Sequence, residues 1–145
     1  MFQHMLIAVD GSPLSESALR RALAFAREIR ARASVIRVIP AFHIHTYQVE
    51  LLANTRERYA QAASKVTADY LHDIAGEARA AGVPCETLSV IHDHPHEAII
   101  KAAQDRNCDL IVMASHGRRG LQGILLGSET QKVLTHSSIP VLVYR

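Results

Sequence analysis

Residues 109–128 read DLIVMASHGRRGLQGILLGS, and this stretch decides the fold. Residues 109–114 are almost wholly apolar, which is typical of a strand buried on both faces of a sheet. A glycine-bearing loop follows, and Ser128-Glu-Thr-Gln131 then has the form of a capping box, which marks the start of a helix. A buried strand, a loop and a helix in this order are typical of a parallel α/β sheet.

The same alternation extends in both directions from this stretch. Apolar runs predict further strands at 6–9, 33–39, 83–91 and 140–144. Ser12 and Pro13 mark the start of a helix, Pro95 and Glu97 open another, and apolar spacing predicts a long helix over 52–81. The order βαβαβαβαβ predicts one doubly wound α/β domain over residues 1–145. Its five-stranded parallel sheet would have the order 3-2-1-4-5, with two helices on each face.

Composition and charge argue against several classes of protein. The chain has 145 residues, and its 16 basic and 14 acidic side chains are mixed along it, so neither a nucleic acid nor a membrane is expected as a partner. The spacing of Cys85 and Cys108 fits neither a disulfide framework nor a zinc module, and both should be small buried residues. The first ten residues contain an apolar run of only five, too short for a signal peptide, so a cytoplasmic location is expected.

Candidate binding residues follow the strands. In doubly wound sheets, ligands bind beyond the carboxyl ends of the strands, where the strand order reverses. Gly117 follows the fourth strand and Gly127-Ser128 opens the last helix, where free N–H groups and the helix dipole suit a phosphate. Turns that require positive φ would explain these glycines equally well. The sequence contains neither a Walker A loop nor a GxGxxG fingerprint after the first strand.

The whole chain resembles the universal stress proteins of the UspA type. The matching segments are IAVDGS at 7–12, DLIVMASHGRRG at 109–120, LLGS at 125–128 and IPVLVY at 139–144. Nucleotide-binding members carry G-x2-G-x9-G-[ST], and Gly117, Gly127 and Ser128 match it, whereas Ala114 replaces the first glycine. Because extended backbone at a strand end accommodates alanine, we expect the extra methyl to weaken nucleotide binding rather than to abolish it.

The resemblance implies a site for ATP with Mg²⁺. It places Asp10 beside the ribose and the backbone of Val38 against adenine. It also implies that Gly127, Ser128 and the amide of Glu129 hold the phosphates. The residues alone do not distinguish ATP from ADP, AMP or a cyclic nucleotide.

Further residues complete the candidate site. His116 and Arg118 could contact phosphate, although His116 could simply pack in the loop and Arg118 could be a solvated charge. The strand-end residues that complete the candidate set are Gly11, Ser12 and Met113. His92, His94 and His96 could bind a transition metal, but solvent-facing loop histidines are the favoured interpretation because no four-ligand set is recognisable.

The predicted function is that of a nucleotide-binding universal stress protein acting in stress response or signalling, with at most slow ATP hydrolysis. The resemblance implies a homodimer through the last strand, and the uncharged run Val141–Tyr144 supports it, because uncovered edge strands pair. A dimeric interaction module that binds no nucleotide is the alternative. A hydrolase is less favoured, because no carboxylate pair, Ser-His-Asp order or metal quartet accompanies Asp10 and His116.

Overall fold

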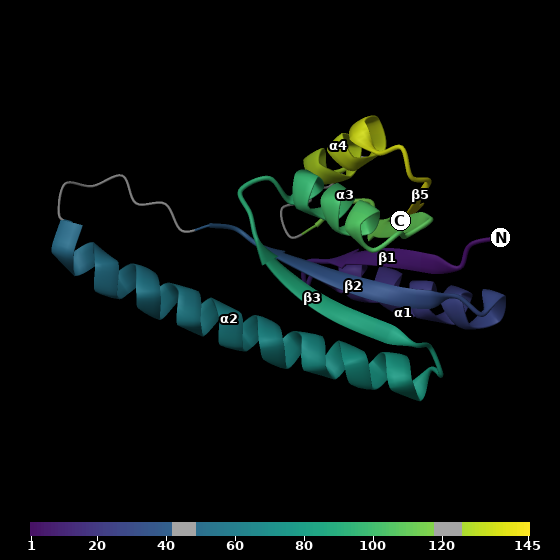
Figure 1. The fold of residues 1–145 in the computed structure, drawn as a ribbon, viewed down its shortest axis with the longest axis horizontal. Helices are drawn as coiled ribbons and strands as arrows, with labels where there is room; N and C mark the ends of the chain where they lie inside the picture. The colour runs from purple at the N-terminus through teal and green to yellow at the C-terminus, as the bar shows by residue number, and fades with distance from the viewer. Residues whose placement is uncertain (42–48, 118–125) are drawn as a thin grey trace.

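In the described residues, 1–41, 49–117 and 126–145, the computed structural model has five strands and four helices (Figure 1). Side chains are described throughout these ranges except at 49–54. The strands are β1 (His4–Val9), β2 (Arg32–Ile39), β3 (Cys85–Ile91), β4 (Leu110–Ala114) and β5 (Val141–Tyr144). The helices are α1 (Pro13–Ile29), α2 (Val49–Ala80), α3 (Pro95–Asp105) and α4 (Ser128–His136). Every predicted strand and helix is present, and the differences lie at the ends of the elements.

The strand order is β3-β2-β1-β4-β5, and all four neighbouring pairs are parallel. This confirms the predicted doubly wound sheet. From β1 the chain leads outward through β2 and β3, and then crosses to β4 and β5 on the other side of β1. The order therefore reverses between β1 and β4, and their carboxyl ends frame the place where such sheets bind ligands.

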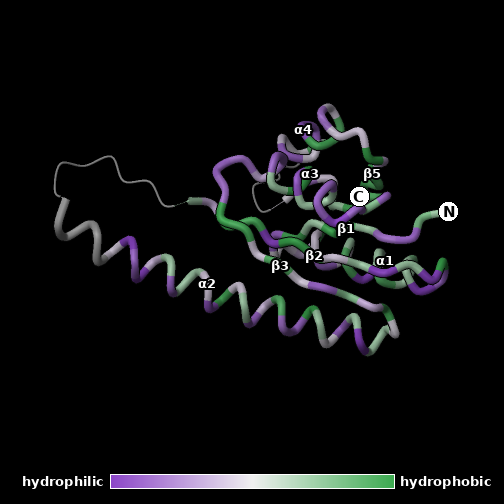
Figure 2. The backbone as a smooth tube through the Cα atoms, viewed as in Figure 1, coloured by the Kyte–Doolittle hydropathy of each residue, from purple (hydrophilic) through white to green (hydrophobic). Residues whose placement is uncertain are grey.

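Alternate residues of the strands point to two separate cores. Met5 and Ile7 of β1 pack with α1 and α2, whereas Leu6 packs with α3 and α4. The predicted arrangement of two helices on each face is therefore confirmed (Figure 1). Figure 2 shows apolar residues gathered along the central strands, as expected for strands that are covered on both sides.

Helix α2 covers the sheet with its carboxyl-terminal half only. Its buried residues begin at Thr67 and continue through Leu71, Ile74 and Ala78, whereas Val66 is exposed. Figure 1 shows the amino-terminal half extending past the end of the sheet. No helix in the described part of the chain is long and apolar enough to cross a membrane.

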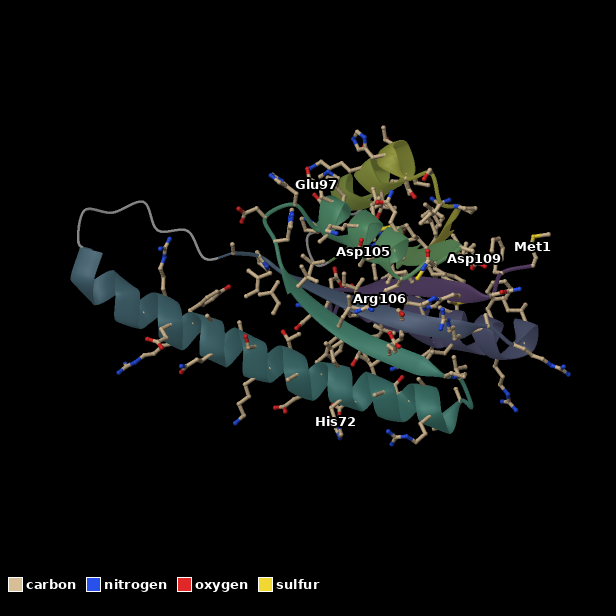
Figure 3. The ribbon with its side chains drawn as sticks, in the orientation of Figure 1. Met1, His72, Glu97, Asp105, Arg106 and Asp109 are labelled. Atoms are coloured by element: carbon tan, nitrogen blue, oxygen red, sulfur yellow. The ribbon has the colours of Figure 1, made fainter. Side chains whose placement is uncertain are left out.

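A buried histidine lies at the amino end of β1, away from the strand ends that frame the predicted site. His4 Nδ1 faces the carbonyl of Arg106 at 3.1 Å, so it carries the hydrogen, and Nε2 accepts from the Ser34 hydroxyl at 2.8 Å. Asp109, labelled in Figure 3, accepts from the His4 amide at 3.0 Å. Burial and the charge of Arg32 lower the pKa of His4 below its ordinary value of 6.5.

Candidate functional site

Two glycines bring the ends of β1 and β4 and the start of α4 together. A Cβ on Gly117 would overlap Oδ2 of Asp10, which follows β1. A Cβ on Gly127 would lie 3.2 Å from Cα of His116 and 3.4 Å from the carbonyl oxygen of Ser115, closer than such contacts normally allow. The absence of a side chain at both positions therefore lets three segments approach one another at the carboxyl edge of the sheet.

These glycines are not explained by positive φ. Within the described residues, the glycines with positive φ are Gly11, at 77°, and Gly82, at 73°. Gly127 has a φ of −68°, which any residue can adopt, and Gly117 is likewise outside the left-handed region. The alternative explanation of Gly117 and Gly127 as positive-φ turn residues is therefore wrong; what the structure shows instead is close approach, of the Asp10 carboxylate to Gly117 and of the backbone at 115–116 to Gly127.

The carboxylate of Asp10 is held in place by the start of α1. Its Oδ1 accepts from the amide of Ser12 at 2.9 Å, and the Asp10 amide donates to the hydroxyl of Ser15 at 3.0 Å. Ser12 is also the N-cap of α1, and its hydroxyl accepts from the Ser15 amide at 3.2 Å. Gly11, between them, adopts the positive φ that this tight turn requires. The predicted residues 10–12 thus form one hydrogen-bonded turn that presents Asp10 to Gly117.

Ala114 is the last residue of β4 and pairs with Tyr144 of β5. It is buried, its backbone is extended, and its carbonyl accepts from the hydroxyl of Thr130 at 3.0 Å. An extended backbone is the condition under which alanine can replace a glycine without strain, and this condition is met.

Two other predicted residues lie on the face of the sheet that α3 and α4 cover. Met113 is buried in that core, and Val38 packs against it from β2. The β1–β2 ladder ends at the Val9–Arg37 pair, one residue before Val38. Val38, Met113 and the start of α4 therefore share one side of the strand ends.

Helix α4 begins differently from the prediction. Gly127 is its N-cap and Ser128 its first residue, so Thr130 rather than Gln131 occupies the third position, and the predicted capping box does not form. Gln131 instead donates to the carbonyl of Leu126 at 3.3 Å. No side chain caps α4 in the described residues. The amide of Gly127 donates to the Ser115 carbonyl at 2.6 Å and that of Gln131 to the Gly127 carbonyl at 3.0 Å, so the amides of residues 128–130 are those without a partner in the helix. This start offers amides and a positive dipole end to an anion.

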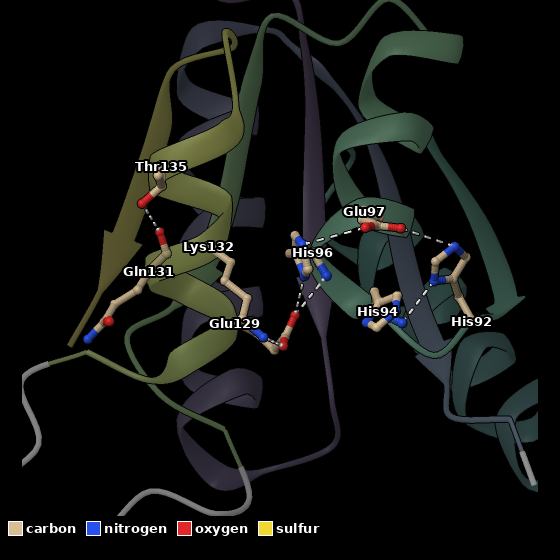
Figure 4. A network of polar contacts seen from close by, with 8 residues as sticks. All are labelled: His92, His94, His96, Glu97, Glu129, Gln131, Lys132 and Thr135. Atoms are coloured by element: carbon tan, nitrogen blue, oxygen red, sulfur yellow. Dashed lines mark hydrogen bonds and ion pairs between the residues drawn. The ribbon is translucent and has the colours of Figure 1, made fainter. Parts of the chain in front are cut away.

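The side chain of Glu129 turns from α4 toward the start of α3. Its Oε2 accepts from the amide of His96 at 2.8 Å and from Nδ1 of the same residue at 3.1 Å, and Lys132 donates to Oε1 at 3.2 Å (Figure 4). Burial alone would raise the pKa of Glu129, but these three donors outweigh it and hold the pKa below its ordinary value. The sequence did not reveal this contact, because no motif links two residues 33 positions apart.

The histidine run is divided by the start of α3. His94 is exposed and His92 half-buried, and the His94 amide donates to Nδ1 of His92 at 2.9 Å. His96 lies inside α3 with only 13% of its side chain exposed, so its prediction as a solvent-facing loop residue is wrong. Pro95, which follows His94, is the first residue of α3, and the side chain of His96 in that first turn points toward α4. In the described residues, no three histidine, cysteine or acidic side chains are arranged so that they could hold a metal ion together.

The remaining predicted residues are placed as follows. His116 lies beside Gly127, and its Nδ1 is 3.1 Å from the hydroxyl of the buried Ser115. Arg118 lies outside the described residues. Cys108 is buried and Cys85 half-buried, and burial raises the pKa of each thiol to about 11, which suits small structural residues rather than reactive thiolates.

Comparison with known proteins places the chain in a family. The model of the universal stress protein family matches residues 1–145. The chain is 32% identical to universal stress protein YxiE of Bacillus subtilis over the full length of both. It is 30% identical to universal stress protein MJ0577 of Methanocaldococcus jannaschii, over all of this chain and 96% of that protein. A solved structure of MJ0577 has a TM-score of 0.86 at 29% identity, covering 99% of this chain and 95% of that one. A universal stress protein in complex with cAMP shares the fold, with a TM-score of 0.67 at 23% identity over 99% and 97% of the two chains. This chain therefore belongs to the universal stress protein family.

Proposed function

We propose that this universal stress protein binds ATP together with Mg²⁺ at the carboxyl ends of β1 and β4. The start of α4 is the observation that carries the proposal. Gly127 brings it against the end of β4, and no described side chain caps it, so its amides can donate hydrogen bonds to the phosphates. The positive end of the helix dipole adds to this attraction.

Four of the predicted residues have defined roles in the proposed complex. Asp10, held by the Ser12 amide, would accept from a ribose hydroxyl. Adenine would lie near Val38 and Met113, on the same side of the strand ends as the start of α4. Glu129 would contribute its amide to the phosphates. Mg²⁺ would bridge phosphate oxygens and keep most of its water, so it needs few protein ligands.

Family membership supports a nucleotide as the ligand. The spacing Gly117-x9-Gly127-Ser128 follows the pattern of the nucleotide-binding members. A protein of the same fold is described in complex with cAMP, so a nucleotide is a known ligand on this fold. The resemblance implies ATP, and a helix start that offers several amides suits a ligand with more than one phosphate, so ATP is the nucleotide we propose.

The proposal includes a homodimer that acts in the cytoplasm in stress response or signalling. β5 is an edge strand, and all four of its side chains are half-buried in one copy of the chain. Its residues Val141–Tyr144 are uncharged, so pairing with a second copy would satisfy the open edge and cover apolar surface.

Catalysis is at most slow in this proposal. Nδ1 of His116 lies 3.1 Å from a hydroxyl, but that hydroxyl belongs to the buried Ser115, and the carboxylate of Asp10 accepts from the Ser12 amide, so we expect neither residue to activate an exposed nucleophile. One observation, the methyl group of Ala114 in place of the motif glycine, favours a second candidate: a dimeric interaction module that binds no nucleotide.

Isothermal titration of the wild type and of Ala114→Gly with ATP, ADP and AMP, with and without Mg²⁺, tests the proposal. We expect both proteins to bind ATP, and the glycine variant to bind it equally or more tightly. No heat from either protein at millimolar nucleotide rejects the site. Binding only by Ala114→Gly assigns the wild type to the interaction module.

Thermal unfolding gives an independent measurement. ATP at 100 times its Kd should add about 2.7 kcal/mol to the free energy of unfolding. The shift is compared within each variant, because glycine in place of a strand alanine by itself costs about 0.5–1 kcal/mol.

A further inference from the structure

The first turn of α3 receives its cap from another helix. His94, the N-cap residue of α3, makes no side-chain cap hydrogen bond. The carboxylate of Glu129 on α4 takes this place, because Oε2 accepts from the backbone amide of His96, the second residue of α3. The same oxygen accepts from Nδ1 of the His96 ring, which must therefore carry a hydrogen. We call this pair of hydrogen bonds the Glu129–His96 clamp (Figure 4).

The charges around the clamp hold the carboxylate where it is. Lys132 donates to Oε1 of Glu129 at 3.2 Å, and the amino end of α3 adds its positive dipole end. Nε2 of His96 lies 4.0 Å from Oε1 of Glu97, and the ring of His136 lies 5.9 Å from the ring of His96. His96 is thus placed between two carboxylates, and its side chain is nearly buried.

The clamp affects the proposed phosphate site because Glu129 lies in the first turn of α4. It is the second residue of the helix, so its amide belongs to the first turn that would receive the phosphates. A carboxylate in that turn would repel a phosphate if it turned back toward the amides, and would compete for them. The clamp turns it toward α3 and ties the first turn of α4 to a neighbouring helix.

We propose that Glu129 is a positioning residue for the phosphate site: the clamp fixes the first turn of α4 and keeps the Glu129 charge away from the bound phosphates. This inference rests on the proposed function. It differs from the family pattern, which assigns a role only to the backbone amide at this position.

Glu129→Ala and Glu129→Gln distinguish positioning from simple repulsion. If the carboxylate only repels phosphate, both substitutions remove one negative charge and both tighten ATP binding. If it positions the helix, Glu129→Ala weakens ATP binding about tenfold, because binding must then order a first turn of α4 that the clamp no longer fixes. Glu129→Gln keeps the affinity, because its amide oxygen can still accept from the His96 amide. The sign of the alanine effect is therefore decisive.

Isothermal titration with Mg-ATP and with adenosine provides the measurement. Adenosine has no phosphate, so its affinity should be the same in the wild type and in both Glu129 variants. Glu77→Gln is the matched control: it removes the same charge from an exposed side chain of α2, on the opposite face of the sheet, and it should leave ATP affinity unchanged. His96→Ala should weaken ATP binding less than Glu129→Ala, because the backbone donor remains.

Amide hydrogen exchange of the protein without nucleotide gives a second readout. Exchange of the Gln131 amide, which donates to the carbonyl of Gly127 at 3.0 Å, should accelerate in Glu129→Ala and not in Glu129→Gln. Tighter ATP binding by Glu129→Ala, or equal losses for ATP and adenosine, would overturn the inference. If Glu129→Ala does not fold, His96→Ala decides by the same two ligands: an unchanged ratio of ATP to adenosine affinity overturns the inference. Failure of the wild type to bind ATP rejects the proposed function itself, so the two failures are distinguishable.

Discussion

Replacing Gly117 with alanine would displace the carboxylate of Asp10 and leave the strands in place. The added Cβ would occupy the position of Oδ2 of Asp10, so the carboxylate must rotate away. Only the end of a side chain has to move, and we expect the sheet to form as before. The hydrogen bond from the Ser12 amide to Oδ1, 2.9 Å long, would be lost or lengthened. Losing one such bond costs about 1 kcal/mol, which lowers the melting temperature of a chain of this size by about 3 °C.

The effect of Gly117→Ala on ATP binding should be larger than its effect on stability. A hydrogen bond from a ribose hydroxyl to a carboxylate contributes about 1.5–3 kcal/mol, so its loss should weaken ATP binding about 10- to 100-fold. Isothermal titration measures the affinity, and circular dichroism follows the melting temperature of the same samples.

Gly76→Ala is the matched control for this experiment. Gly76 lies inside α2, and a Cβ there would meet no heavy atom within 4 Å. We expect this variant to gain about 1 kcal/mol of stability from helix propensity and to bind ATP as the wild type does. Wild-type ATP affinity in Gly117→Ala would refute the role of Asp10. A collapse of its cooperative melting would instead refute the expectation that only a side-chain end has to move.

Two further predictions concern stability and assembly. The pKa of His4 is lowered in the folded protein, so the unfolded chain binds its proton first as the pH falls below 6.5. The contribution of His4 to the free energy of unfolding should thus be full above that pH and decline below it by at most about 1.4 kcal/mol per pH unit. The urea midpoints at pH 7.5 and pH 5.5 should therefore differ less in His4→Gln than in the wild type. An equal difference in the two proteins contradicts the assignment to His4. Val143→Lys places a charge on the edge strand β5 and should convert a dimer into a monomer of 16.0 kDa by light scattering. A wild type that is already monomeric at micromolar concentration contradicts the proposed dimer.

The fold could be predicted because its signals are local. Each buried strand is a short apolar run, and Ser12 with Pro13 marks the start of α1 by residue type alone. The parallel order then follows from the alternation of strands and helices together with the handedness of their crossovers. The position at which α4 begins is not fixed by such a local signal. It depends on how Gly127 packs against His116, and a capping-box pattern in the sequence carries no information on that contact.

The reasons behind the site residues were also beyond the sequence. A glycine can provide positive φ or allow close approach, and only the neighbours of Gly117 and Gly127 show that the second reason applies here. His96 appeared in the sequence as one of three similar histidines. Its helical position, and the carboxylate of Glu129 that meets it, give it surroundings that His92 and His94 do not share.

Three helices begin near the carboxyl edge of the sheet, and their first turns differ in a way that favours one place for an anion. The hydroxyl of Ser12 caps α1, and the carboxylate of Glu129 caps α3. In the described residues, no side chain caps α4, although its N-cap Gly127 is packed tightly against β4. Since the amides at this helix start have no side-chain partner and lie at the positive end of the helix dipole, an anion bound there would gain hydrogen bonds that are already made at the starts of α1 and α3. The carboxylate of Glu129 thus accepts from the first turn of α3 and does not compete for the amides of its own helix. The start of α4 therefore remains the place where phosphates would add the most hydrogen bonds.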